Sequence, residues 1–173
     1  MLSLKMAHLL YRLEHGEMPE TLHPKVWWLL IGTNDLGMGC SVDTIVAGNI
    51  RIVQEIHSRS TISLRKANDH HQQQSPTSIV INSILPRGSQ ELSLKESPWP
   101  TLQKVNQKLQ CYAELNPHVH FVNVTQAFVA EMDDKKGLYV NEEMFEPDHV
   151  HPSPQGTKAW LELVVENVLE LMA

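Results

Sequence analysis

The chain has 173 residues, of which 42% are hydrophobic and 20% charged, and this length suits one domain with a core of its own. Its net charge of −6 excludes the basic surface of a general nucleic-acid-binding protein. No apolar run approaches the about 20 residues that a membrane-spanning helix requires, so we expect no membrane span.

Helical and extended patterns alternate from the first residues onward. Apolar residues recur at helical spacing over 2–13, and Gly16 is suited to end that helix. The run 26–31 is apolar at every position, which predicts a strand that is covered on both faces, as in a parallel sheet. Ser41 or Asp43 is placed to cap a second helix.

The second half of the chain repeats this alternation. Residues 58–78 are polar and predict a surface insertion, after which 79–85 predicts a second strand. A third helix is expected from Ser97-Pro98, a third strand over 118–124, and a last helix from Ser153-Pro154. This order predicts a single α/β domain over 1–173, with a parallel sheet, right-handed crossovers and helices on both faces.

Two polar segments fall where sites form in such sheets, beyond the carboxyl ends of the strands. The first is Gly32-Thr33-Asn34-Asp35, directly after the apolar run. The side-chain amide of Asn34 could donate to a developing oxyanion, although taken alone an Asx turn that closes the connection is the simpler explanation. Asp35 is expected to cap the helix or loop that follows.

The second segment is Asp148-His149-Val150-His151, before the last helix. At a spacing of three, the carboxylate of Asp148 can accept from the Nδ1–H of His151 and hold the ring in one tautomer. The Nε2 atom could then take a proton from a nucleophile. The alternative is that Asp148 caps a turn and that His151 is an ordinary loop histidine.

Together these segments resemble those of the SGNH hydrolases, a family with four short sequence motifs, called blocks. In chain order the blocks are G-D-S, a glycine, G-x-N-D and D-x-x-H. Gly32-Thr33-Asn34-Asp35 matches the third block and Asp148-x-x-His151 the last, and Ser153-Pro154-Gln155-Gly156 resembles the turn that usually follows. Three further segments are similar to platelet-activating-factor acetylhydrolase catalytic subunits, namely 10–17, 24–26 and 84–88.

The resemblance implies a three-layer, flavodoxin-like fold and a serine ester hydrolase. It implies that His151 is the general base and acid, that Asp148 orients it, and that Asn34 and Gly32 form the oxyanion hole. It also implies a small acyl ester as substrate, no cofactor and no metal. The similar acetylhydrolase subunits are intracellular, which favours a cytoplasmic location.

The nucleophile of the family has no counterpart, because the sequence contains no G-D-S. We expect that the first two βα units of the fold are missing and that the nucleophilic serine is absent with them. The serines Ser3, Ser41, Ser83 and Ser153 lie near expected strand ends or loops, but none is in the family's motif.

Three alternatives remain open. The chain could be a non-catalytic protein that retains the fold and binds or pairs with another subunit. Without the first strand, 26–31 becomes a sheet edge with two tryptophans, and we expect a homodimer or subunit pairing through it. A zinc site is the third alternative, if His118 and His120 share a strand face near the 148–151 segment.

Two other residues have expected roles near the site. Arg87, after the second strand, either lines the pocket or forms a surface pair. Asn106, on the third helix, could bond a loop backbone close to the reacting groups.

Overall fold

The computed structural model describes residues 5–19, 21–68, 77–88, 97–132 and 135–172. Its centre is a three-stranded parallel sheet with the order β1-β2-β3. In this register Trp28 lies opposite Val80, and Val80 opposite His120. The bounds of the strands are β1 (Val26–Leu29), β2 (Ser78–Asn82) and β3 (Val119–Val122).

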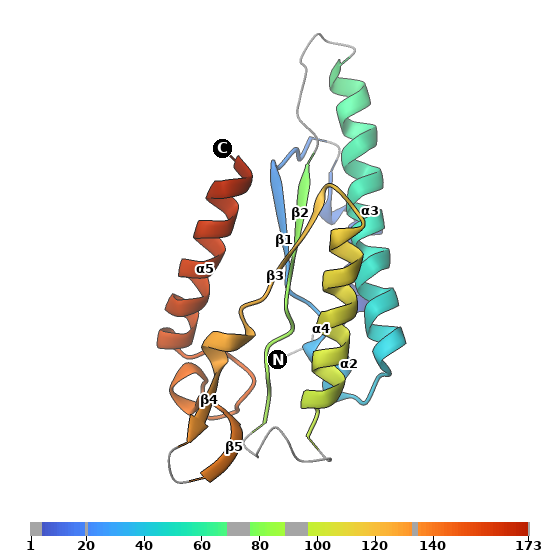
Figure 1. Cartoon of the computed structure of the whole chain (residues 1–173). Helices are drawn as coiled ribbons and strands as arrows, with labels where there is room; N and C mark the ends of the chain where they lie inside the picture. The colour runs from blue at the N-terminus through green and yellow to red at the C-terminus, as the bar shows by residue number, and fades with distance from the viewer. Residues whose placement is uncertain (1–4, 20, 69–76, 89–96, 133–134, 173) are drawn as a thin grey trace.

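Helices cover both faces of the sheet, so the fold has the three layers that the sequence predicts (Figure 1). One face carries three helices and the other a single long helix. The helices on the first face are α1 (Met6–Arg12), α3 (Val42–Asn68) and α4 (Trp99–Glu114), and the helix on the second face is α5 (Pro154–Met172). None of the helices in the described ranges is both long and apolar enough to cross a membrane.

The alternation of side chains along β2 divides the core into two parts. Ile79 and Ile81 pack with α1, α3 and α4, whereas Val80 points to the opposite face and packs with α5. All three side chains are fully buried, which accounts for the unbroken apolar run in this strand. On the α5 side, the indole Nε1–H of Trp160 donates to Asn82 Oδ1 at 2.8 Å and fixes the helix against the sheet.

The structure differs from the sequence predictions in three places. The polar insertion expected over 58–78 begins as helix, because α3 continues to Asn68 without a proline or glycine to end it. The rest of that segment, apart from Thr77 and Ser78, lies outside the described residues. Gly16, with a φ of 108°, ends the first helix as predicted, but the last turn of that helix is a π-type turn over Leu13–Glu17.

The third difference is an antiparallel hairpin, β4 (Val129–Met132) and β5 (Lys135–Val140), which follows β3 and precedes the histidine segment. Its strands are short, and one charged residue in β4 and two lysines and a glycine in β5 interrupt their apolar residues, so the period-two pattern on which strand prediction rests is weak there. The hairpin lies with α2 (Thr33–Gly37) at the carboxyl end of the sheet (Figure 1).

Candidate active site

Gly32 sets the direction in which the chain leaves β1. Its φ of 112° lies in the left-handed region, and a Cβ at this position would stand 2.9 Å from Ile84 Cδ1 and 3.2 Å from Ile45 Cγ2. A glycine is therefore required both for the backbone conformation and for the close packing. The turn begins α2 at once and places Asn34, which is half-buried, in its first turn.

Asp35 has a different role from the cap that the sequence predicts. Its buried carboxylate accepts a hydrogen bond from the backbone N–H of Met6 at 3.2 Å, across 29 residues of sequence. Met6 is the first residue of α1, so Asp35 caps the preceding helix rather than the following one. The G-T-N-D turn is thereby tied to α1.

Asp148 and His151 form a hydrogen-bonded pair. His151 Nδ1 lies 2.5 Å from Asp148 Oδ2, and the other carboxylate oxygen accepts from the backbone N–H groups of Val150 and His151 at 2.9 and 3.0 Å. These bonds, that of the His151 backbone foremost, hold the pKa of Asp148 well below its ordinary value. An ionised Asp148 fixes the Nδ1–H tautomer, which leaves the Nε2 lone pair for proton transfer.

His149 shapes the backbone of the 148–151 segment, although the sequence analysis gave it no role of its own. His149 has a φ of 50°, the positive value of a left-handed residue, and its backbone carbonyl accepts from the N–H of Gly88 at 3.1 Å. Non-glycine residues with positive φ are uncommon and mark positions that the surrounding structure imposes. The D-H-V-H segment is thus joined to the loop after β2.

That loop also contacts the first motif, through Arg87. The guanidinium of Arg87 donates to the backbone carbonyl of Thr33 at 2.5 Å and packs over Gly37 of the same short helix. Residues 87 and 88 therefore connect Gly32-Thr33-Asn34-Asp35 on one side with 148–151 on the other. Arg87 therefore positions the backbone of the turn, a role that the sequence did not suggest.

Asn106 holds the same loop from α4. Its side chain accepts from the backbone N–H of Ile84 at 2.8 Å and donates to the Ile84 carbonyl at 3.1 Å, and it is buried. The bond to a loop backbone that the sequence predicts is present. It fixes the segment in which Ile84 packs against Gly32.

The serine hydroxyls near this edge of the sheet are engaged elsewhere. Ser83 is fully buried and its Oγ accepts from the Val124 N–H at 3.0 Å and from Thr125 Oγ1 at 3.2 Å. Ser153 donates to the Glu143 carbonyl at 2.6 Å and accepts from the Gly156 N–H at 3.1 Å.

The other two candidate serines are Ser41 and Ser3. Ser41 accepts from the Thr44 N–H at 3.2 Å and caps α3. Ser3 lies outside the described residues. Each of the three candidates in the described ranges, Ser41, Ser83 and Ser153, thus has a hydroxyl that is hydrogen-bonded to the backbone.

The turn before α5 explains another part of the sequence resemblance. A Cβ on Gly156 would stand 2.0 Å from the backbone oxygen of Met144, and the Ser153 N–H donates to that same oxygen at 2.9 Å. Glycine is therefore required at the start of α5. This packing sets the helix directly after His151.

The histidines of β3 are not brought to the site. His118 precedes the first residue of β3, at the opposite end of the strand from its carboxyl edge, and its ring stacks on His57 at 6.4 Å. Burial, with a smaller contribution from His118, lowers the pKa of His120. Within the described ranges, no three His, Cys, Asp or Glu side chains gather closely enough to hold a metal ion.

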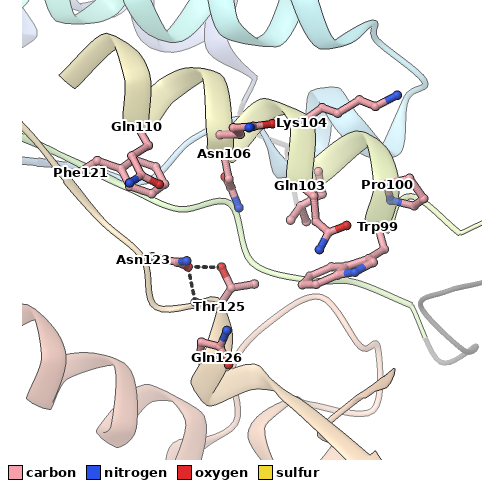
Figure 2. Close-up of a pocket in the computed structure, with 12 residues that line it drawn as sticks. Trp99, Pro100, Gln103, Lys104, Asn106, Gln110, Phe121, Asn123, Thr125 and Gln126 are labelled. Atoms are coloured by element: carbon pink, nitrogen blue, oxygen red, sulfur yellow. Dashed lines mark hydrogen bonds between the residues drawn. The ribbon is translucent and has the colours of Figure 1, made fainter. Parts of the chain in front are cut away.

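A recess of about 500 Å³ lies between α4 and the end of β3. Figure 2 shows the side chains of Gln103, Asn106 and Thr125 around this recess, with the indole of Trp99 at one end. Its lining includes Lys104 as a charged residue and is otherwise neutral. The recess contains neither Asn34 nor the Asp148–His151 pair, so we assign no reaction to it.

Comparison with solved structures identifies the fold. A protein from Bacteroides fragilis described as an acylhydrolase has a TM-score of 0.72 and 16% identity, over 98% of this chain and 72% of its own. A GDSL-like lipase from Bacteroides thetaiotaomicron has a TM-score of 0.70 and 17% identity, over 96% and 72% of the two chains.

A Streptococcus pneumonia protein whose description refers to platelet activating factor has a TM-score of 0.67 and 23% identity, over 95% of this chain and 68% of its own. No curated protein sequence matches the chain.

The chain therefore has the α/β fold of the SGNH/GDSL-type hydrolases to which these structures belong. The sequence profile of the GDSL-like lipase/acylhydrolase family matches residues 6–159. The chain belongs to this family.

Proposed function

We propose that the chain carries the acid–base and oxyanion groups of an ester hydrolase, and that none of its own serines is the nucleophile. The observation that carries this proposal is the 2.5 Å contact between Asp148 Oδ2 and His151 Nδ1. The second carboxylate oxygen is already bound to two backbone N–H groups, so the carboxylate cannot rotate away from the ring. Such a pair is suited to general-base catalysis.

His151 Nε2 accepts the proton of the attacking hydroxyl group as that oxygen bonds to the ester carbonyl carbon. The tetrahedral intermediate then collapses, the C–O bond to the alcohol breaks, and the same proton passes from Nε2 to the departing alkoxide. Asp148 stabilises the imidazolium formed in between and remains ionised. In this chain, which has no G-D-S motif, we propose that the attacking group is water.

The oxyanion formed during attack requires hydrogen-bond donors. We propose that the backbone N–H of Gly32 and the side-chain amide of Asn34 supply them. Both residues follow β1 directly, and both are held by the packing of Gly32 on Ile84 and by the Arg87 contact with Thr33. Preorganised donors of this kind contribute more than any other single group in acyl transfer.

We propose small acyl esters as the substrate class, with acetyl esters of lipids or sugars as candidates. The neighbour whose description refers to platelet activating factor supports a lipid ester weakly, at 23% identity. A cytoplasmic location rests only on the similarity to intracellular acetylhydrolase subunits. The reaction as proposed uses no cofactor or metal.

Hydrolysis of p-nitrophenyl acetate tests the proposal. We expect His151→Ala to lower the protein-dependent rate by roughly 100-fold, the contribution of a general base, with His23→Ala within experimental error of the unchanged chain. His23 is an exposed histidine outside the site, so it controls for unspecific imidazole catalysis. Equal rates in the two variants would contradict the proposal.

A fluorophosphonate probe tests the part that concerns the nucleophile. We expect no labelling of the chain, because it has no G-D-S motif and the candidate serines Ser41, Ser83 and Ser153 are hydrogen-bonded to backbone groups. Labelling of a serine, located by mass spectrometry and abolished by His151→Ala, would show that a serine of this chain attacks the ester.

A second candidate function is a non-catalytic protein that binds an acyl ester or a partner. The engagement of Ser83 and Ser153 in structural bonds favours it. The two functions differ in one measurement. A non-catalytic protein would perturb the NMR signals of the 148–151 segment on addition of an ester analogue, without any hydrolysis that depends on His151.

A further inference from the structure

The recess between α4 and the end of β3 has a lining that is almost free of charge. None of the twelve described residues that line it is acidic. Lys104 is the one basic residue among them, and in Figure 2 its side chain extends away from the centre of the recess. Half of the lining residues carry a side-chain amide, namely Gln103, Asn106, Gln107, Gln110, Asn123 and Gln126. The recess is therefore neutral and rich in groups that both donate and accept hydrogen bonds.

Three glutamines of α4 stand in one row along the recess. Gln103, Gln107 and Gln110 follow one another at intervals of four and three residues, so they lie on one face of the helix. All three are exposed, and the side chains of Gln103 and Gln107 have no hydrogen-bond partner among the described residues. Gln110 Nε2 donates to Glu114 at 3.1 Å, which leaves the amide oxygen of Gln110 as an acceptor. The row thus presents amide N–H groups and amide oxygens to a ligand.

Asn123 lines the recess from the end of β3, and its amide has a fixed orientation. Its Oδ1 accepts from the backbone N–H of Thr125 at 3.1 Å and from Thr125 Oγ1 at 2.5 Å (Figure 2). Because both bonds engage the oxygen, the amide nitrogen remains as a donor, and it has no partner among the described residues. A donor that is already oriented loses little conformational entropy when a ligand binds.

Trp99 forms one end of the recess. Its ring is partly buried, because it packs against both parts of the hydrophobic core. The rest of the ring lines the recess, where Figure 2 shows it beside the amide of Gln103. The backbone N–H of Trp99 donates to Ser97 Oγ at 3.2 Å and holds the start of α4. The indole therefore offers a flat apolar surface whose position is set before any ligand binds.

We propose that this recess binds a neutral saccharide. A sugar ring has an apolar C–H face, which suits an indole, and hydroxyl groups that each donate and accept, which suit side-chain amides. The volume of about 500 Å³ is within the range of small-molecule sites, about 300–1,000 Å³. A phosphate group would require more cations than Lys104, and a metal ion prefers the carboxylate and imidazole ligands that this lining does not have.

The recess lies at the same end of the sheet as the candidate active site. Trp99 begins the helix that follows β2, and Asn123 comes directly after β3. Asn106 connects the two places, because it lines the recess while its amide holds the backbone of Ile84, which packs against Gly32. Binding at the recess nevertheless uses none of the groups assigned to ester hydrolysis, so it is independent of the proposed function.

Titration with neutral disaccharides, followed in ¹H–¹⁵N NMR spectra of the whole chain, tests the saccharide site. The probes are cellobiose, maltose and N,N′-diacetylchitobiose. We expect at least one of them to shift the indole Nε1–H signal of Trp99 and the side-chain amide signals of Gln103 and Asn123, with a Kd of about 1 mM. The Kd should be the same at about 50 and 500 mM NaCl, because a neutral ligand is not subject to ionic screening. Trp99→Phe assigns the indole signal among those of the four tryptophans.

Two exposed glutamines provide the variant that tests the amide row. Gln103→Ala combined with Gln107→Ala should weaken binding about tenfold or more, because two hydrogen-bonding groups are lost. Both residues are exposed, so the double variant should retain its circular dichroism spectrum and thermal midpoint. Gln54→Ala, at an exposed position of α3 outside the recess, is the control and should bind as the unchanged chain does. His151→Ala should also bind normally, which separates the saccharide site from the proposed hydrolysis.

Three results would overturn the saccharide site. The first is that none of the three disaccharides shifts the signals of Trp99, Gln103 and Asn123 at about 50 mM. The second is equal affinity of the double variant and of Gln54→Ala. The third is a response of the same signals to inorganic phosphate at lower concentration than to any of the disaccharides, which would make the recess an anion site.

Discussion

The guanidinium of Arg87 donates to the backbone carbonyl of Thr33, 54 residues earlier in the sequence, at 2.5 Å. This bond fixes the loop after β2 against the turn after β1. Because the next residue, Gly88, donates to the His149 carbonyl, the loop sits between the two motifs of the candidate site. The geometry of the site therefore depends on a residue that belongs to neither motif.

Arg87→Ala should lower the free energy of unfolding by about 1–2 kcal/mol, because the Thr33 carbonyl loses a charged donor. It should also lower the His151-dependent rate, since the Asn34 turn loses a support. Urea denaturation and the p-nitrophenyl acetate assay measure the two effects. Arg51 is exposed and pairs with Glu14 and with Glu55, which keeps its bond to Arg59, so Arg51→Ala should cost less than about 1 kcal/mol and leave the rate unchanged. If the two variants lost the same free energy of unfolding and the same hydrolysis rate, Arg87 would have no special role at the site.

Gly32→Ala should destabilise the protein more than Gly39→Ala. Both glycines have positive φ, 112° and 80°, so both substitutions strain the backbone, at a cost of about 1 kcal/mol or more. Only at Gly32 does the new Cβ also meet Ile84 and Ile45, which adds about 1–3 kcal/mol of overpacking. Thermal denaturation of the two variants separates backbone strain from crowding, and equal losses would contradict this account.

Asn106→Ala should cost about 2–3 kcal/mol, because it leaves the buried N–H and C=O of Ile84 without their partner. The matched control is Gln110→Ala on the same helix, where an exposed amide bonds only Glu114 and the expected cost is below about 0.5 kcal/mol. Chemical denaturation followed by circular dichroism checks both values. A small effect at Asn106 would mean that water replaces its hydrogen bonds.

At pH 3.8 an ordinary aspartate is half protonated, whereas Asp148 should remain ionised. Because folding lowers the pKa of Asp148, the hydrogen bonds of its carboxylate stabilise the folded protein at pH values above the ordinary pKa of aspartate. This stabilisation is lost as the pH falls through the pKa that Asp148 has in the folded protein. The carboxyl carbon signal of Asp148 in NMR reports the protonation directly.

The matched variant for that titration is His151→Ala. It removes the imidazole but keeps the backbone N–H groups, so the midpoint of Asp148 should rise toward 3.8 without reaching it. A midpoint at the ordinary value in the unchanged chain would show that the carboxylate is not held as described.

Local sequence patterns were sufficient for the order of the main elements. An unbroken apolar run predicted β1, because a strand covered on both faces is mostly apolar, a largely apolar segment predicted β2, and helical periodicity predicted α4 and α5. The pairing of Asp148 with His151 also follows from a spacing of three, since the loop needs only one turn to bring them into contact. The β4–β5 hairpin was missed because its charged strands carry no such pattern.

The sequence by itself thus determined the α/β class, the family motifs and the local histidine–aspartate contact. Tertiary structure alone decided that Asp35 caps α1, that Arg87 supports the Thr33 turn, and that Ser83 is a buried structural hydroxyl. The physical reason is that periodicity reports which face of an element is buried, whereas contacts across tens of residues depend on how the chain brings those faces together.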